Sequence, residues 1–296
     1  GYTMHHAISQ DKQGNILATV SKTSAKIANG KDVRINDFII RMDPEKGEIL
    51  QEWDLVNMLD SARYGMTDYN LTADPYAQNA SNWAHNNGIV EWGNDYLATA
   101  RYQGIFKFNK AGGIEWIISP HGYWRDRYLK LLLNPLHADG TPITDPDVIA
   151  GTKNCDDFEW PWGCHTAVPL PNGHILYFNN GYGRNFKLDF TDRKNIYTCG
   201  IEYEVDEVNR TVRQIWQYGK ERGAAYFTPA RSGVQYLEQT GNRLICPGMS
   251  NVLSNGNRGA RVTEVDPETQ DVVFELELED AIYQRVYRMS LYPENQ

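Results

Sequence analysis

The stretch AHNNGIVEWGNDYLATARYQGIFKFNKAGGIEWII, residues 84–118, decides the fold. A glycine turn at Gly93 is flanked by polar residues and followed by apolar ones, and a second turn rich in Asn and Gly lies between alternating apolar and polar residues. Successive side chains of a strand point to opposite faces, so each turn with its flanks predicts a β-hairpin. Two hairpins make one unit of four antiparallel strands.

This unit recurs three more times along the chain. The first turn has counterparts in QGNILATV, PNGHILYF and TGNRLICP, and the second hairpin has counterparts in FIIRMDPEKGEILQEWDL, EYEVDEVNRTVRQIWQY and TEVDPETQDVVFELELE. One aromatic residue follows each second turn, and we expect the four to share one buried position: Trp53, Trp116, Trp216 and Phe274. Repeated four-stranded units predict an all-β fold, a β-propeller with four blades in residues 1–296.

Three of the units carry a histidine eight residues before the turn glycine, namely His6, His85 and His165. Equivalent positions on the innermost strands of a propeller face its central axis. We therefore expect these imidazoles to converge on one cavity, although 80 residues separate His85 from His165. The equivalent position in the fourth unit is Gly233.

Polar residues accompany two of these histidines. Asn87 lies two residues after His85 and hence on the same strand face, and Arg101 follows in the next strand. Arg184 follows His165 in FNNGYGRNF. Imidazoles, a carboxamide and guanidinium groups suit an anion with several oxygens. The strands carry no nearby Asp or Glu, which argues against a glycosidase with paired carboxylates.

Composition limits the partners of the chain. The net charge of −9 argues against nucleic acid, and no stretch approaches the ~20 apolar residues that a membrane span needs. The sequence opens at Gly1 without an initiator Met or a signal peptide, so we expect a mature or truncated product with sequence missing upstream. A homodimer is compatible with these features.

Two cysteines flank a short loop, NCDDFEWPWGC, that ends one residue before His165. Their spacing is too wide for a typical metal site, so we expect a disulfide between Cys155 and Cys164, with free buried thiols as the alternative. A disulfide would imply an oxidising compartment and a periplasmic or secreted protein.

Two long insertions interrupt the repeat, at residues 54–82 and 119–163, and each precedes one of the histidines. Both are rich in Tyr and Trp, and long ordered loops in compact domains often form lids or binding walls. We interpret them as inter-blade lid loops. Residues 123–133 suggest a short helix, either inside the second lid or covering a blade edge.

The segments WAHNNG, CHTAVPLPNGHILYFNNG and GYTMHHAISQDKQGNIL resemble the bacterial aryl sulfotransferases that use no nucleotide donor. The resemblance runs from Gly1 to about residue 290 and implies a six-bladed propeller preceded by a smaller β domain, so that only four blades fall in this sequence. It also implies ping-pong transfer of a sulfuryl group from a phenolic sulfate donor to a phenol acceptor through a sulfated histidine. No cofactor or metal is implied.

The resemblance also assigns roles to residues. It implies that His165 is the nucleophile, that His85 and Asn87 bind sulfate, and that Arg101 is the site arginine. The pair His5–His6 supplies a further histidine, and the eight-residue register selects His6. A hydroxyl ligand falls near Gly233, and either Ser232 or Thr228 supplies it. The sequence reads HHA where the family commonly has HHD, which leaves the orientation of this pair open.

Two other classes of function remain open. Three converging imidazoles would suit zinc or copper, but Asn87 and the arginines count against a bound cation. The propeller could instead be a binding or structural module with a degenerate site. Metal analysis separates the first alternative, and an assay with an aryl sulfate separates the second.

Overall fold

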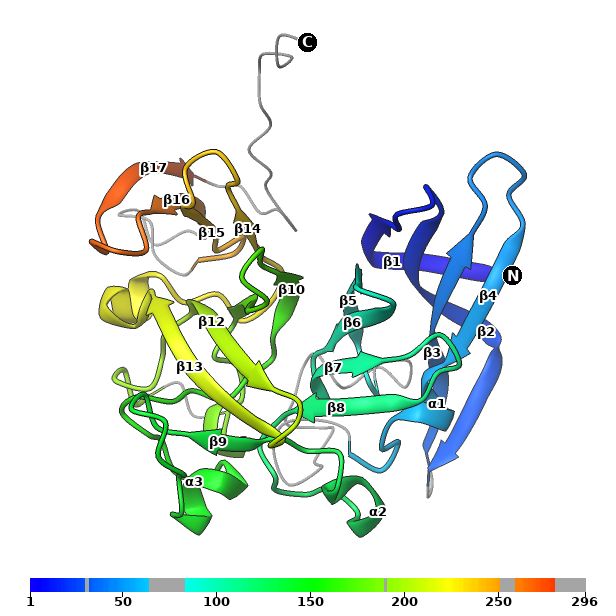
Figure 1. Ribbon diagram of the computed structural model, residues 1–296, viewed down its shortest axis with the longest axis horizontal. Helices are drawn as coiled ribbons and strands as arrows, with labels where there is room; N and C mark the ends of the chain where they lie inside the picture. Colours follow the sequence, from blue (N-terminus) through cyan, green and yellow to red (C-terminus); the bar gives the residue numbers. More distant parts are fainter. Residues whose placement is uncertain (30–31, 64–82, 189–190, 251–258, 280–296) are drawn as a thin grey trace, which may run out of the picture.

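A computed structural model describes residues 1–29, 32–63, 83–188, 191–250 and 259–279. Its strands form four antiparallel sheets arranged around a common centre, with the first strand of each sheet nearest that centre (Figure 1). This arrangement confirms the predicted all-β propeller with four blades. Among the described residues, no helix is long and apolar enough to cross a membrane.

The first two blades follow the predicted hairpins strand by strand. The first contains β1 (Tyr2–Gln10), β2 (Ile16–Asn29), β3 (Asp32–Met42) and β4 (Ile49–Asp54). The second contains β5 (Asn86–Trp92), β6 (Asp95–Ala100), β7 (Gly104–Phe108) and β8 (Ile114–Ile118). Both sheets have strictly sequential strand order, as hairpin connections require.

The third blade gains an extra strand, and the fourth has the basic plan. The third contains β10 (His165–Pro169), β11 (Ile175–Asn179), β12 (Cys199–Asp206) and β13 (Thr211–Tyr218), and β9 (Asn134–Leu136) pairs in parallel with β13. The fourth contains β14 (Gly233–Tyr236), β15 (Arg243–Cys246), β16 (Gly259–Val265) and β17 (Val272–Glu279).

Hydrophobic side chains fill the spaces between neighbouring blades. Trp53 of the first blade packs edge-on against Tyr96 and Phe108 of the second, and its indole donates a hydrogen bond to the Lys110 carbonyl at 3.0 Å. Trp116 of the second blade donates to Glu207 of the third at 2.8 Å. The repeated tryptophan therefore packs against the next blade and donates a hydrogen bond to it.

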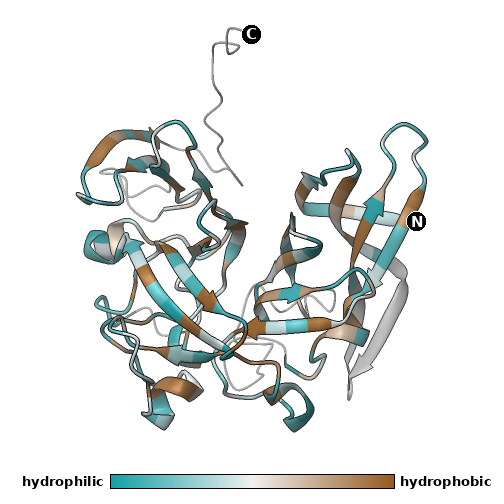
Figure 2. Ribbon diagram, in the orientation of Figure 1, coloured by the Kyte–Doolittle hydropathy of each residue, from teal (hydrophilic) through white to brown (hydrophobic). Residues whose placement is uncertain are grey.

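The fourth copy of this position departs from the prediction. Trp53, Trp116 and Trp216 are buried, but Phe274 is 49% exposed, so its predicted burial is wrong. Phe274 lies on β17, the outermost strand of the last described blade, and several of its neighbours on that strand are also exposed and hydrophobic (Figure 2). The position is buried only where a following blade covers it.

The second insertion lies mainly along the outer rim. Its short helices α2 (Asp126–Leu129) and α3 (Pro146–Ala150) lie with β9 beyond β8 and β13 (Figure 1). The predicted helix in 123–133 is therefore a single turn at the edge of the blades. The first insertion contributes α1 (Leu55–Met58), and most of it, 64–82, lies outside the described residues.

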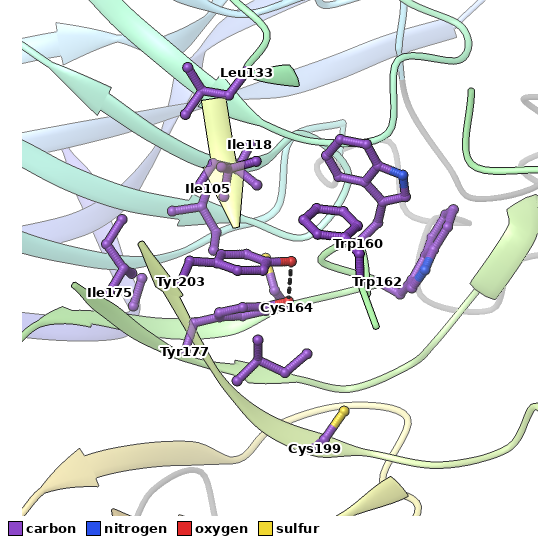
Figure 3. Close-up of a cluster of buried hydrophobic side chains, with 14 of the residues drawn as sticks. Ile105, Ile118, Leu133, Trp160, Trp162, Cys164, Ile175, Tyr177, Cys199 and Tyr203 are labelled. Carbon is purple, nitrogen blue, oxygen red and sulfur yellow. Dashed lines mark hydrogen bonds between the residues drawn. The ribbon is translucent and has the colours of Figure 1, made fainter. Parts of the chain in front are cut away.

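The returning part of the second insertion enters the core. Trp160 and Trp162 are buried between the second and third blades, where they pack with Tyr177 and Tyr203 (Figure 3). Two short 3-10 segments complete the described elements, at Arg184–Phe186 and, with a kink at Gly223, at Lys220–Ala225. In this structure residues 119–163 brace the blades that carry two of the histidines.

Candidate active site

Irregular backbone marks the axial end of three innermost strands. The pairing register shifts between Met4 and Ile8 in β1, between Asn86 and Gly88 in β5, and between His165 and Ala167 in β10. Such β-bulges re-aim side chains at the edges of sheets. The repeat thus places the same distortion beside each of the three histidines.

Left-handed backbone accompanies these bulges. His6 has φ of 57°, His85 has φ of 54°, and Thr166, directly after His165, has φ of 46°. Such conformations cost non-glycine residues about 1–3 kcal/mol each, and the cost is severe for a β-branched threonine. Two of the strained residues share the register position, and the third lies one residue further on in its strand; strain retained at such sites is typical of a functional site.

The bulges bring the histidines together. His6 Nε2 lies 3.1 Å from His85 Nε2, and the rings of His6 and His165 have centroids 6.2 Å apart. One ring nitrogen from each of the three residues lies within 4.8 Å of the others. His5 Nδ1 lies 2.9 Å from His6 Nδ1 but contacts neither of the other two in this way, so His6 occupies the shared site as the register predicts.

Exposure falls steadily across the cluster. His6 lies at the surface, His85 is half-buried, and His165 is only 4% exposed. Both ring nitrogens of His6 face other histidines, and His85 Nδ1 is buried without a hydrogen-bond partner among the described residues. A buried polar atom in that condition is costly unless a ligand satisfies it.

Arg101 supplies the positive charge beneath the histidines. It is 1% exposed, donates from Nη2 to the Pro229 carbonyl at 2.7 Å, and lies over the Tyr182 ring at 4.4 Å. Its backbone N–H donates to the His85 carbonyl at 3.0 Å, which ties this arginine to the bulge of β5. A fixed, buried guanidinium is suited to an anionic group.

Burial and charge keep the cluster neutral. The pKa values of His165 and His85 lie well below the usual value, mainly because burial disfavours the imidazolium, and secondarily because Arg101 and neighbouring histidines repel the charge. His6 is exposed as a residue, but the groups packed around its ring desolvate it and lower its pKa to about 3, with charge repulsion from His5, Arg101 and Arg231 adding to the shift. Neutral imidazoles at physiological pH keep a lone pair for nucleophilic or basic chemistry.

Asn180 joins the site although the sequence analysis gave it no role. It follows β11, and its Oδ1 lies 2.6 Å from Nδ1 of His165. Its Nδ2 donates to the carbonyls of Thr228 at 2.9 Å and Arg231 at 3.2 Å. Asn180 belongs to the asparagine pair in the segment FNNG, but nothing in the sequence shows that its side chain reaches His165 across the hairpin.

Asp37 is a second residue that the sequence analysis missed. It is buried on β3, accepts hydrogen bonds from the Asn86 N–H and the Ser21 hydroxyl, each at 3.3 Å, and lies 3.8 Å from His5 Nε2. Burial raises the pKa of this carboxyl to about 7, although the amides of Asn86 and His85 oppose the shift. Asp37 thereby fixes the backbone at Asn86, directly after His85.

Asn87 and the two candidate hydroxyls lie around this cluster. Asn87 donates to the Cys164 carbonyl at 2.8 Å and accepts from Thr99 at 2.6 Å, so it links β5 to the residue before His165. Ser232 accepts from the Gly248 N–H at 2.9 Å and lies 3.4 Å from the Thr228 hydroxyl. Contact of these side chains with substrate stays a prediction.

Arg184 lies in different surroundings from those expected. Its guanidinium pairs with buried Glu159, donates to the carbonyls of Asn195 and Tyr197 at 3.2 Å each, and stacks on the Tyr197 ring at 3.8 Å. It lines a separate cavity of about 120 Å³ together with Lys187 and Asn195. These contacts tie Arg184 to the loop that contains Glu159, and its contact with substrate stays a prediction.

The predicted disulfide is wrong for this structure. None of the four cysteines, all within the described residues, is cross-linked. Cys164 is buried beside Tyr177 and Tyr203, whose hydroxyls lie 2.8 Å apart (Figure 3). Cys155 donates from Sγ to Asp157 Oδ1 at 3.1 Å. The two thiols lie in different environments, so their proximity in sequence was misleading as evidence for a disulfide.

Known proteins share this sequence pattern. The family model described as Arylsulfotransferase (ASST) matches residues 1–288. Arylsulfate sulfotransferase AssT of Lelliottia amnigena is 29% identical over 97% of this chain, and that of Escherichia coli O6:H1 is 28% identical over the same share. The chain spans 52% of the length of each relative.

A solved structure described as the Dos1 propeller is similar over 96% of this chain and 64% of its own, with 9% identity and a TM-score of 0.37. The propeller assignment made above rests on the four sheets of this chain. The family match covers nearly the whole sequence. The chain belongs to the arylsulfotransferase (ASST) family.

Proposed function

We propose that this chain transfers a sulfuryl group from an aryl sulfate ester to a phenol, with His165 as the covalent carrier. The observation that carries this proposal is a buried, neutral imidazole in a cluster that contains two further imidazoles and the guanidinium of Arg101. The family relatives are arylsulfate sulfotransferases by name, which supports the substrate class.

In the first half-reaction, a ring nitrogen of His165 attacks the sulfur of the donor. The N–S bond forms while the S–O bond to the phenol breaks, and the phenolate leaves with the bonding pair. Charge spreads over the sulfuryl oxygens in such a loose transition state, so positioning and cationic stabilisation carry the catalysis. We assign the contact with those oxygens to Arg101, which is buried, and to Nδ1 of His85, which is buried without a hydrogen-bond partner among the described residues.

In the second half-reaction, the acceptor phenol attacks the same sulfur and the N–S pair returns to His165. A neutral imidazole of His6 or His85 takes the proton that the phenol loses. The lowered pKa values leave these rings unprotonated beforehand and make the imidazolium a strong acid that gives the proton up readily. The resulting imidazolium returns this proton to the phenolate that leaves in the next cycle. Protons balance over the two halves, and one aryl site serves both phenols in a ping-pong sequence.

Intact mass spectrometry tests this proposal. Brief exposure to an aryl sulfate, followed by acid-free digestion, should reveal an adduct of about 80 Da on the peptide that contains His165. Added phenol should remove the adduct and yield the new aryl sulfate. Adduct on a different residue, or its absence while transfer proceeds, would rule out the covalent role of His165.

A metal site is the second candidate, favoured by the three ring nitrogens within 4.8 Å of one another. Such a set fits zinc or copper in ligand type, but Arg101 lies close enough to lower the pKa of each imidazole by charge repulsion and would repel a cation likewise. Activity that disappears with a chelator and returns with zinc would establish the metal function instead.

A further inference from the structure

The hydrogen bond between His165 and Asn180 has a defined direction. Asn180 Nδ2 faces two backbone carbonyls, those of Thr228 at 2.9 Å and Arg231 at 3.2 Å. A carbonyl oxygen accepts and cannot donate, so the NH₂ end of the carboxamide must lie on that side. Oδ1 therefore faces the imidazole, at 2.6 Å from Nδ1 of His165.

This direction fixes the proton on the imidazole. An amide oxygen is only an acceptor, so Nδ1 of His165 must carry the hydrogen in the bond. A neutral imidazole has one N–H and one lone pair, and the lone pair is then on Nε2. The tautomer of the buried ring is set by the partner of its other nitrogen, as it is in the triads of hydrolases.

Asn180 is itself held rigidly. It directly follows β11, and its backbone carbonyl accepts from the Thr198 hydroxyl at 2.8 Å. The same Thr198 hydroxyl accepts from the Thr228 N–H at 2.9 Å, so the two backbone segments that grip Asn180 are joined to each other. Side chain and backbone together leave the carboxamide no alternative orientation in which its donors and acceptor are all satisfied.

We propose that Asn180 is a positioning residue that directs sulfuryl transfer to Nε2 of His165. The inference rests on the proposed function and adds the identity of the reacting atom. The Nε2 lone pair forms the N–S bond as the S–O bond breaks, and Nδ1 keeps its proton throughout. The sulfated ring gains positive charge in this step, which strengthens its hydrogen bond to the Asn180 oxygen until the acceptor phenol removes the sulfuryl group.

Two measurements on the 296-residue chain test the proposal. Long-range ¹H–¹⁵N correlation NMR reports which ring nitrogen is protonated, and the His165 signals are identified by their loss in His165→Asn. We expect the proton on Nδ1 in the wild type and a mixture of tautomers in Asn180→Ala. Single-turnover formation of the sulfated peptide should slow about 10–100-fold in that variant, by analogy with the loss of the hydrogen-bond partner of a metal-ligating histidine.

Two further variants separate positioning from general loosening of the fold. Asn179→Ala removes a neighbouring carboxamide that bonds Trp162 N–H and the Trp160 carbonyl instead of His165, and it should leave the tautomer on Nδ1. Asn180→Asp keeps an acceptor for Nδ1–H and should restore that tautomer, at the cost of some stability because its second oxygen faces the Thr228 and Arg231 carbonyls without a donor. Its carboxylate should also raise the pKa of His165, moving the acidic limb of the labelling rate to higher pH.

The outcomes divide cleanly. A wild-type proton on Nε2, or an Asn180→Ala variant with unchanged tautomer and unchanged labelling rate, overturns the role of Asn180. A wild type that forms no sulfated peptide overturns the proposed function, while the NMR result still decides the tautomer. Equal tautomer mixtures in Asn179→Ala and Asn180→Ala would mean that only general packing is at work.

Discussion

The third and fourth blades share the same order of four antiparallel strands but differ at the central axis and at the outer rim. At the axis, the third blade presents His165, whereas the fourth presents Gly233. At the rim, Trp216 of the third blade is 8% exposed and packs among residues that include Val234 and Ile245 of the fourth, whereas Phe274 is 49% exposed. The repeat therefore gives both blades the same four-stranded backbone. The residue type at the axis and the contact with a neighbouring blade at the rim decide whether an equivalent position is reactive or buried.

The largest expected effect is at the axis. Replacing His165 by Asn should reduce sulfuryl transfer by at least about 10⁴-fold, because the covalent route disappears while binding groups remain. Ser232→Ala, one residue before the axial glycine of the fourth blade, should cost far less because Ser232 forms no bond to sulfur. Initial rates with an aryl sulfate and a phenol measure both.

The circular dichroism spectrum and the urea midpoint of His165→Asn serve as controls for folding. A loss of transfer with an unchanged midpoint assigns the effect to chemistry. Substantial transfer by His165→Asn would instead remove the distinction between the two axial positions.

The rim gives the next largest difference. Trp216→Ala should lower the free energy of unfolding by about 3–5 kcal/mol, since it empties a buried site between two blades. Phe274→Ala should change it by less than about 1 kcal/mol, because much of that ring already contacts solvent. Urea unfolding followed by tryptophan fluorescence and by circular dichroism gives both values. Equal losses in the two variants would show that Phe274 is covered in solution.

Much of this contrast could be read from the sequence. Turn glycines and alternating strands predicted the four blades, and the eight-residue register predicted that His6, His85 and His165 meet. The register could not find Asn180 or Asp37, because the eight-residue spacing does not encode their contacts. Asn180 reaches His165 across their hairpin, and Asp37 accepts from the Asn86 N–H of the neighbouring blade. It also could not distinguish Phe274 from Trp216, since burial of either depends on a neighbouring blade and not on its own hairpin.

Arg184 and the cysteines illustrate a different limit. Arg184 follows His165 closely in sequence, but Glu159, from the insertion, lies against its guanidinium. Cys164 points into the core while Cys155 bonds to Asp157. Partner choice of this kind is decided by three-dimensional packing, on which residue spacing carries little information.

Lowering the pH should change the contribution of His165, at the axial position of the third blade, to the free energy of unfolding. The axial position of the fourth blade should make no such contribution. Burial lowers the pKa of His165 in the folded protein, so the unfolded chain binds the proton more readily and this residue destabilises the fold as pH falls below about 6.5. The stability of wild type relative to His165→Asn should therefore decline between pH 7.5 and 5.5. Taking the difference removes the opposing contribution of Asp37, whose raised pKa favours the folded state as pH falls through about 7.

Urea unfolding of both proteins at the two pH values gives this comparison, and the fourth blade offers a matched control. Gly233 carries no titratable group, so Ser232→Ala beside it should track the wild type at each pH. A difference between wild type and His165→Asn that stays constant with pH would mean that the imidazole is not desolvated in the folded protein.

The smallest effect is expected in the loop that leads into the third blade, which has no counterpart before the fourth. Cys155→Ser should change stability by less than about 0.5 kcal/mol, because a serine hydroxyl can replace the thiol as the donor to Asp157 and no cross-link is lost. Alkylation in denaturant without reductant should modify four thiols in the wild type. Alkylation of only two thiols, together with a large loss of stability in Cys155→Ser, would mean that a disulfide forms in solution. The third blade would then be stabilised by a covalent bond instead of by packing around Cys164.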